Sequence, residues 1–127
     1  MSSNLQEAKA LLVEDDPQVQ RILVDFFQEN KFKVHAVASA EAALVMMTSY
    51  KYSFMLTDVG LPGMNGFELI KKAKRLNPQM LFAITTADAY DFDQSLLKLV
   101  DDLILEKPFR NSDFSSLLSK LRLKLSS

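Results

Sequence analysis

The stretch Phe54-Met55-Leu56-Thr57-Asp58 decides the fold, and after one valine the loop Gly60-Leu61-Pro62-Gly63-Met64-Asn65-Gly66 follows it. A short apolar run that stops at a loop rich in glycine and proline is typical of a buried strand. The acidic residue Asp58 stands at the carboxyl end of this strand. Open α/β sheets form their binding sites at that edge, so Asp58 is a candidate site residue.

Two other predicted strands also end in charged residues. The apolar run at residues 10–13 is followed by Glu14 and Asp15, and the run at residues 103–105 leads to Lys107. Acidic groups and a lysine at three strand ends predict a site that binds a metal ion and a phosphate group.

Short apolar runs alternate with helical patterns along the whole chain. Five strands are predicted at residues 10–13, 34–38, 53–57, 80–85 and 103–105. A helix is predicted after each strand, which gives five helices. The fourth helix, marked by Leu96, Leu97 and Val100, is the least regular, and the last begins at Asn111.

Strands that are apolar on both faces and separated by helices imply a parallel sheet covered on both sides. Right-handed crossovers make this a three-layer α/β sandwich, and five such units suit the flavodoxin-like strand order 2-1-3-4-5. In that order Glu14, Asp15 and Asp58 converge at the switch point of the sheet. Thr86 and Lys107 reach the same edge from the fourth and fifth strands.

Size and composition favour one domain, because the chain has 127 residues of which 48% are hydrophobic. We expect a single domain over residues 1–127 with an ordered core over residues 8–123. The net charge of −1, with interspersed acids and bases, argues against bulk attraction to nucleic acid or anionic membranes. The N-terminus lacks a signal-peptide core, cysteine is absent, and no apolar run approaches the roughly 18 residues of a membrane span. These features predict a cytoplasmic protein.

The acidic cluster predicts magnesium. Three crowded carboxylates repel one another unless a cation intervenes, and Mg²⁺ prefers oxygen ligands. Asp58 is the candidate nucleophile because its loop exposes it, Asp15 the candidate direct ligand, and Glu14 a second ligand, direct or through water. Lys107 adds a positive charge for a phosphoryl group.

Four motifs together resemble the receiver domain of bacterial two-component response regulators. They are VEDDP at residues 13–17, Asp58 with LPGMNG at residues 61–66, Thr86-Ala87, and KPF at residues 107–109. Each motif alone is weak, but their order and spacing fit the family over essentially the whole chain.

The resemblance implies a role for each matching residue. Asp58 is expected to accept a phosphoryl group from a kinase histidine, and Glu14 and Asp15 to hold Mg²⁺ together with Asp58 and the main-chain carbonyl of Gly60. Lys107 is expected to pair with the phosphoryl oxygens.

Two further residues match the family. Thr86 corresponds to the hydroxyl residue that moves toward the phosphate, and Pro108 to a proline that is often in cis.

Thr85, beside Thr86, is expected to point into the sheet layer. Asp16 precedes Pro17 and is expected to cap a helix rather than bind metal.

The chain departs from the family pattern at several positions. Ile104 stands where receivers usually carry an aromatic residue that rotates with the switch threonine. Gly60 is smaller than the usual side chain there and leaves the phosphate open to solvent, and Asp88 could orient an attacking water. Val100 replaces the glycine usually found before the fifth strand.

These observations predict a signalling phosphoacceptor and not an enzyme that processes a separate metabolite. A sensor histidine kinase or a histidine phosphotransfer protein would phosphorylate Asp58. Output would pass to an effector protein or a homodimer through the face of helix four, strand five and helix five, without direct contact to nucleic acid.

Three alternatives compete with this hypothesis. The chain could be a receiver-like interaction or dimerisation module that works without phosphorylation, which Ile104 and Val100 favour. An aspartate-dependent phosphatase is disfavoured, because it needs a second aspartate where Gly60 stands. A flavin-binding protein is disfavoured because the acidic loop at residues 14–16 would repel phosphate.

Overall fold

The computed structural model describes residues 9–87, 97–100 and 103–126, and every structural statement below concerns these residues. Its centre is a five-stranded parallel sheet with the predicted order β2-β1-β3-β4-β5. The strands are β1 (Lys9–Val13), β2 (Lys33–Val37), β3 (Phe54–Asp58), β4 (Leu81–Thr86) and β5 (Ile104–Glu106).

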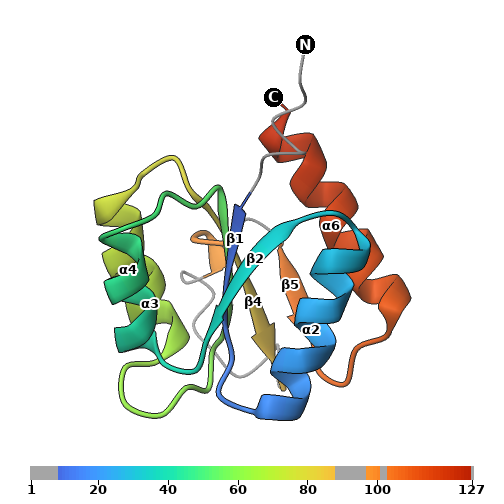
Figure 1. Cartoon of the computed structure of the whole chain (residues 1–127), viewed down its shortest axis with the longest axis horizontal. Coiled ribbons are helices and arrows are strands. Elements are labelled where there is room, and N and C mark those ends of the chain that lie inside the picture. Colours follow the sequence, from blue (N-terminus) through green and yellow to red (C-terminus); the bar gives the residue numbers. More distant parts are fainter. Residues whose placement is uncertain (1–8, 88–96, 101–102, 127) are drawn as a thin grey trace.

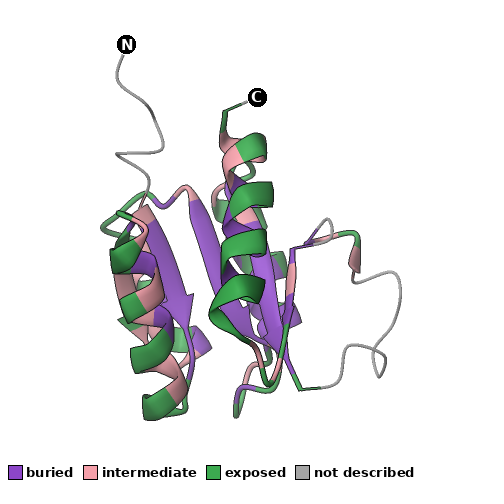
Figure 2. Cartoon of the chain, turned by 90° about the vertical axis from the view of Figure 1, so that its right-hand side faces the viewer, coloured by how far each residue is buried: buried purple, intermediate pink, exposed green. Residues whose placement is uncertain are grey.

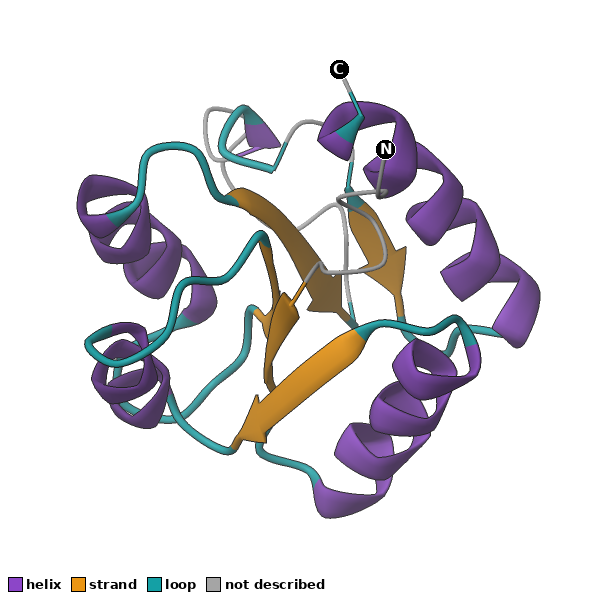
Figure 3. Ribbon diagram, turned by 45° about the horizontal axis from the view of Figure 1, so that its top comes forward, coloured by secondary structure: helices purple, strands orange, loops and turns teal. Residues whose placement is uncertain are grey.

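Helices cover both faces of the sheet, as a parallel sheet requires. Among the described residues they are α2 (Pro17–Glu29), α3 (Ala40–Met47), α4 (Gly66–Leu76) and α6 (Asn111–Leu125). Figures 1 and 3 show α2 and α6 on one side of the sheet, and α3 and α4 on the other. Four of the five predicted helices are therefore present among the described residues, and of the remaining one, marked by Leu96, Leu97 and Val100, the structure describes only residues 97–100.

Burial explains why the central strands read as continuous apolar runs. All five residues of β3 are buried, and so are four of the five residues of β1. In Figure 2 these strands form a buried layer between helices that are exposed on their outer sides. The edge strand β2 contains no fully buried residue. The sheet therefore holds its site-bearing strands rigidly from both sides.

Polar side chains cap the starts of three helices, and the first of them, Asp16, was predicted. The Asp16 carboxylate accepts hydrogen bonds from the backbone of Gln18 and Val19 at 2.9 and 3.3 Å, which confirms its structural role at the start of α2. The Ser39 hydroxyl begins α3 in the same way, and Asn65 caps α4 by accepting from the Glu68 backbone at 2.9 Å. The Asn65 cap closes the loop that begins at Asp58.

Candidate functional site

The predicted site residues lie at one edge of the sheet, where their strands end. Asp58 is the last residue of β3 and lies in register with Thr85 of β4, while Glu14 directly follows β1. Lys107 follows β5, and its backbone N–H donates to the carbonyl of Thr86 at 2.7 Å. The parallel sheet thus aligns four separate stretches of sequence at its carboxyl edge.

Glu14, Asp15 and Asp58 form a compact acidic cluster. Each offers one carboxylate oxygen, and these oxygens all lie within 4.8 Å of one another. Glu14 is 1% exposed and Asp58 9% exposed, whereas Asp15 is exposed at the surface. Buried carboxylates at such separations repel strongly because little water screens them. The cluster therefore favours a cation that enters from the side of Asp15.

Lys107 neutralises part of this charge. Its Nζ lies 3.1 Å from Asp58 Oδ2 and 3.1 Å from Glu14 Oε1. Burial alone would lower the pKa of Lys107, but the contacts with Glu14 and Asp58 outweigh burial and raise this pKa above 10.5. One ammonium group therefore faces two carboxylates and stays charged at any physiological pH.

The neighbours of Glu14 offset only part of the cost of burying its carboxylate. Burial is the main cause that raises its pKa above 4.5, although hydrogen bonds from the Asp16 backbone and Lys107 oppose it. Oε2 accepts the Asp16 N–H at 3.1 Å, but Oε1, although Lys107 Nζ is close, has no well-aligned hydrogen bond within the described chain. A buried carboxylate oxygen in this position suits a divalent cation, so the donor set fits Mg²⁺.

The raised pKa of Glu14 predicts how stability depends on pH without divalent cations. The folded state binds this proton more tightly than the unfolded state, so its stabilising effect is complete below pH 4.5 and is lost as pH rises through the folded pKa. The free energy of unfolding of the native protein, relative to Glu14→Gln, should therefore fall as the pH rises above 4.5. Urea unfolding in EDTA at several pH values measures this difference, and a flat difference would contradict the prediction.

The loop that follows Asp58 binds the second carboxylate oxygen of Asp58 through a hydrogen bond. The Gly60 N–H donates to Asp58 Oδ1 at 3.2 Å, and the Val59 N–H donates to the Thr85 carbonyl at 3.0 Å. A Cβ atom added at Gly60 would have only Asp58 Oδ1 near it, at 3.9 Å. The Asp58 carboxylate thus lies between Gly60 and Lys107, with open space beside it.

Three further predicted residues have clear positions. Thr86 is buried at the end of β4, and Ile104 is half-buried against the core between the sheet and α4. The bond between Lys107 and Pro108 is cis, as the resemblance suggested. Asp88, the predicted water-orienting residue, lies outside the described residues.

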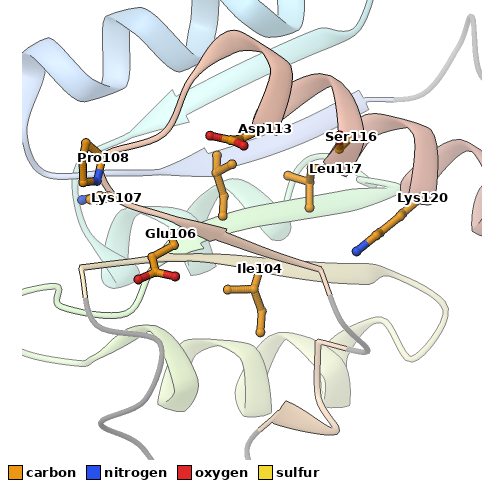
Figure 4. Close-up of a pocket in the computed structure, with 9 residues that line it drawn as sticks. Ile104, Glu106, Lys107, Pro108, Asp113, Ser116, Leu117 and Lys120 are labelled. Atoms are coloured by element: carbon orange, nitrogen blue, oxygen red, sulfur yellow. The ribbon is translucent and has the colours of Figure 1, made fainter.

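A groove between β5 and α6 was not predicted from the sequence. It has a volume of about 440 Å³ and contains Ile104, and Lys107 lies at one end of it (Figure 4). Lys107 also contacts the acidic cluster. Its lining residues are Ile104, Leu105, Glu106, Lys107, Pro108, Asp113, Ser116, Leu117 and Lys120. The four residues from α6 are spaced three or four apart, which places them on one helix face. That helical spacing is the feature of the sequence from which the groove-lining face of α6 could have been predicted.

The described helices include none that is both long and apolar enough to cross a membrane.

Comparison with known proteins gives consistent matches. A family model for the response regulator receiver domain matches residues 10–119. The chain is 31% identical over 115 residues to the two-component response regulator PhoP of Pseudomonas aeruginosa, with 89% of this chain and 51% of that protein covered. It is 28% identical over 116 residues to the response regulator receiver protein CpdR of Brucella abortus, with 89% and 95% covered. The chain thus spans about half of PhoP and nearly all of CpdR.

Solved structures share the fold. A response regulator receiver domain from Methylobacillus flagellatus superposes with a TM-score of 0.81 at 24% identity, covering 89% of this chain and 97% of that one. The response regulator TrrA of Thermotoga maritima, solved in complex with Mg²⁺-BeF, gives 0.80 at 21% identity, covering 90% and 98%.

Proposed function

Because the chain belongs to the response regulator receiver domain family, we propose that it is a signalling switch that accepts a phosphoryl group on Asp58 in a Mg²⁺-dependent reaction. The observation that carries this proposal is the position of the Asp58 carboxylate. It lies among two further carboxylates and 3.1 Å from the Lys107 ammonium group, at an edge that opens to solvent through Asp15. Stability alone does not favour such crowding of acidic groups.

Glu14, Asp15 and Asp58 would hold Mg²⁺, with the Gly60 carbonyl as a further ligand. The half-buried ligand set and the Glu14 oxygen that lacks a hydrogen bond support this assignment. When bound, Mg²⁺ would supply charge neutralisation between the carboxylates and the incoming phosphoryl oxygens. Asp16 is not included, because its carboxylate caps α2.

Phosphoryl transfer then uses the remaining groups of the site. An oxygen of Asp58 attacks the phosphorus of a phosphohistidine, and a phosphorus–oxygen bond forms as the phosphorus–nitrogen bond breaks. The released imidazole nitrogen takes a proton from solvent. Lys107 and the hydroxyl of Thr86 would donate hydrogen bonds to the phosphoryl oxygens, where negative charge concentrates. Hydrolysis by water later releases phosphate and restores the Asp58 carboxylate. The open space beside Gly60 gives that water access.

The partners follow from this chemistry. A sensor histidine kinase or a histidine phosphotransfer protein in the cytoplasm would donate the phosphoryl group. The β5–α6 groove would belong to the output face, because Lys107, which contacts Asp58, also lines the groove (Figure 4). We propose that an effector protein or a second copy of the chain reads this face. We also propose that residues 1–127 form one receiver domain.

Ile104 supports a second candidate function. Because it replaces the family's usual aromatic residue, the surface of β5 could act as an interaction or dimerisation module that does not respond to phosphorylation. That module would bind its partner, or a second copy of itself, equally well with and without beryllofluoride, which mimics the phosphoryl group. Light scattering over a concentration series, with and without the mimic, distinguishes the two functions.

The proposed function is tested by incubation with acetyl phosphate. We expect intact mass spectrometry to show one phosphoryl adduct in the presence of Mg²⁺ and none when EDTA removes it. Absence of an adduct at every Mg²⁺ concentration would overturn the proposal, provided that circular dichroism shows a folded protein.

A further inference from the structure

Thr85 carries a buried hydroxyl group without a hydrogen-bond partner. The residue is 1% exposed, and Oγ1 shares this lack of a partner only with Glu14 Oε1 in the described part of the chain. Burying an unpaired hydroxyl is destabilising, whereas valine has nearly the same shape without the polar atom. Packing alone therefore does not explain a threonine at this position.

Thr85 lies on the same face of the sheet as the reactive groups. Ala83, two residues earlier on β4, belongs to the core under α2 and α6, so Thr85 faces that layer too. Leu105 belongs to the same core, so Lys107 follows on this face of β5. Asp58 is paired in register with Thr85 on the neighbouring strand. These three polar residues therefore share one face at the edge of the sheet.

The path of Lys107 passes the end of β4. In the sheet β4 lies between β5, which carries Lys107, and β3, which carries Asp58. Since Nζ reaches both Asp58 and Glu14 at 3.1 Å, the lysine side chain crosses the end of β4 on the face that bears Thr85. The strand order and the shared face therefore place the unpaired hydroxyl and the lysine side chain on the same side of the sheet at the end of β4.

We propose that Thr85 is a positioning residue of the phosphorylated state, in which its hydroxyl accepts a hydrogen bond from the Lys107 ammonium group, directly or through one water. This inference rests on the proposed function. In the structure Lys107 contacts the two carboxylates that a cation would share. Cation binding and phosphorylation would turn two of its three N–H donors toward the phosphoryl oxygens and leave one for Thr85. The hydroxyl is unsatisfied at rest and satisfied after phosphorylation.

The test compares Thr85→Val and Thr85→Ser with the native chain. Without Mg²⁺, Thr85→Val should raise the melting temperature by a few degrees, because it removes an unpaired buried hydroxyl. With Mg²⁺, the same variant should bind beryllofluoride roughly tenfold more weakly, by fluorine NMR, because a charge-assisted hydrogen bond is lost. Thr85→Ser should restore the affinity.

A matched control separates this role from a structural one. Thr57 is another buried threonine, but its hydroxyl donates to the Asp58 carbonyl at 3.1 Å, so Thr57→Val should lower the melting temperature. The inference is overturned if Thr85→Val binds beryllofluoride as tightly as the native chain, if it melts at a lower temperature, or if Thr85→Ser fails to restore affinity. If the native chain itself binds no beryllofluoride, the proposed function fails instead.

Discussion

Asp58→Asn should abolish the phosphoryl adduct completely, because the amide is no nucleophile toward phosphorus. The same variant should be more stable than the native chain in EDTA. Three carboxylates cluster at this edge and Lys107 contacts only two of them, so removing one negative charge relieves repulsion. We expect the free energy of unfolding to rise by about 1 kcal/mol. The two effects have opposite signs, as expected for a residue that serves function at the expense of stability.

Intact mass spectrometry after incubation with acetyl phosphate and Mg²⁺ measures the first effect, and urea unfolding in EDTA the second. Asp25→Asn is a suitable control, because this exposed residue of α2 lies outside the acidic cluster. It should leave phosphorylation unchanged. An adduct that persists in Asp58→Asn would show that another residue is the phosphoacceptor.

Gly66→Ala should destabilise the fold by about 3 kcal/mol, although alanine is the better helix former. A Cβ at this position would lie 2.4 Å from the Asp58 carbonyl oxygen and 3.0 Å from Val59 Cα. Both are backbone atoms, so the loop itself must move. Because the displaced backbone carries the reactive carboxylate, phosphorylation of the folded variant should slow about a hundredfold.

Urea unfolding and the rate of adduct formation measure these two effects, and Gly60→Ala is the matched control. Its Cβ would meet only Asp58 Oδ1 at 3.9 Å, and its backbone is not left-handed. We expect its stability to stay within about 0.5 kcal/mol of the native chain. If Gly66→Ala were as stable as Gly60→Ala, the close approach of the loop to Asp58 would be wrong.

The sequence predicted the sheet order and the Asp16 helix cap well, because both depend on local patterns and on topology rules that admit few alternatives. The end of the first strand was predicted correctly at Val13, but the ends of the other four strands were displaced by one residue. The third strand was predicted at residues 53–57 and spans Phe54–Asp58, since Asp58 still pairs with Thr85 in the ladder. The hydrophobic pattern of a sequence indicates which residues are buried, but it does not show which residue forms the last backbone pair of a strand.

The convergence of Glu14, Asp15, Asp58 and Lys107 was predicted from the strand order, but individual side-chain contacts across several strands could not be predicted. Thr85 was expected to point into the sheet layer, but its unpaired hydroxyl depends on neighbours from two other strands. Likewise, the sequence placed Lys107 opposite the acidic cluster without indicating that Glu14 and Asp58 share it equally. The β5–α6 groove depends on how α6 packs against the edge strand, which no local pattern encodes.

The most direct test of the acidic cluster is a calorimetric titration with Mg²⁺ of the native chain, Asp15→Asn and Asp16→Asn. These neighbouring carboxylates differ in role, because Asp15 belongs to the cluster and Asp16 caps α2. We expect one Mg²⁺ to bind the native chain and Asp16→Asn with equal affinity, and Asp15→Asn to bind at least about tenfold more weakly. Equal affinity of Asp15→Asn and the native chain would contradict the proposed magnesium site.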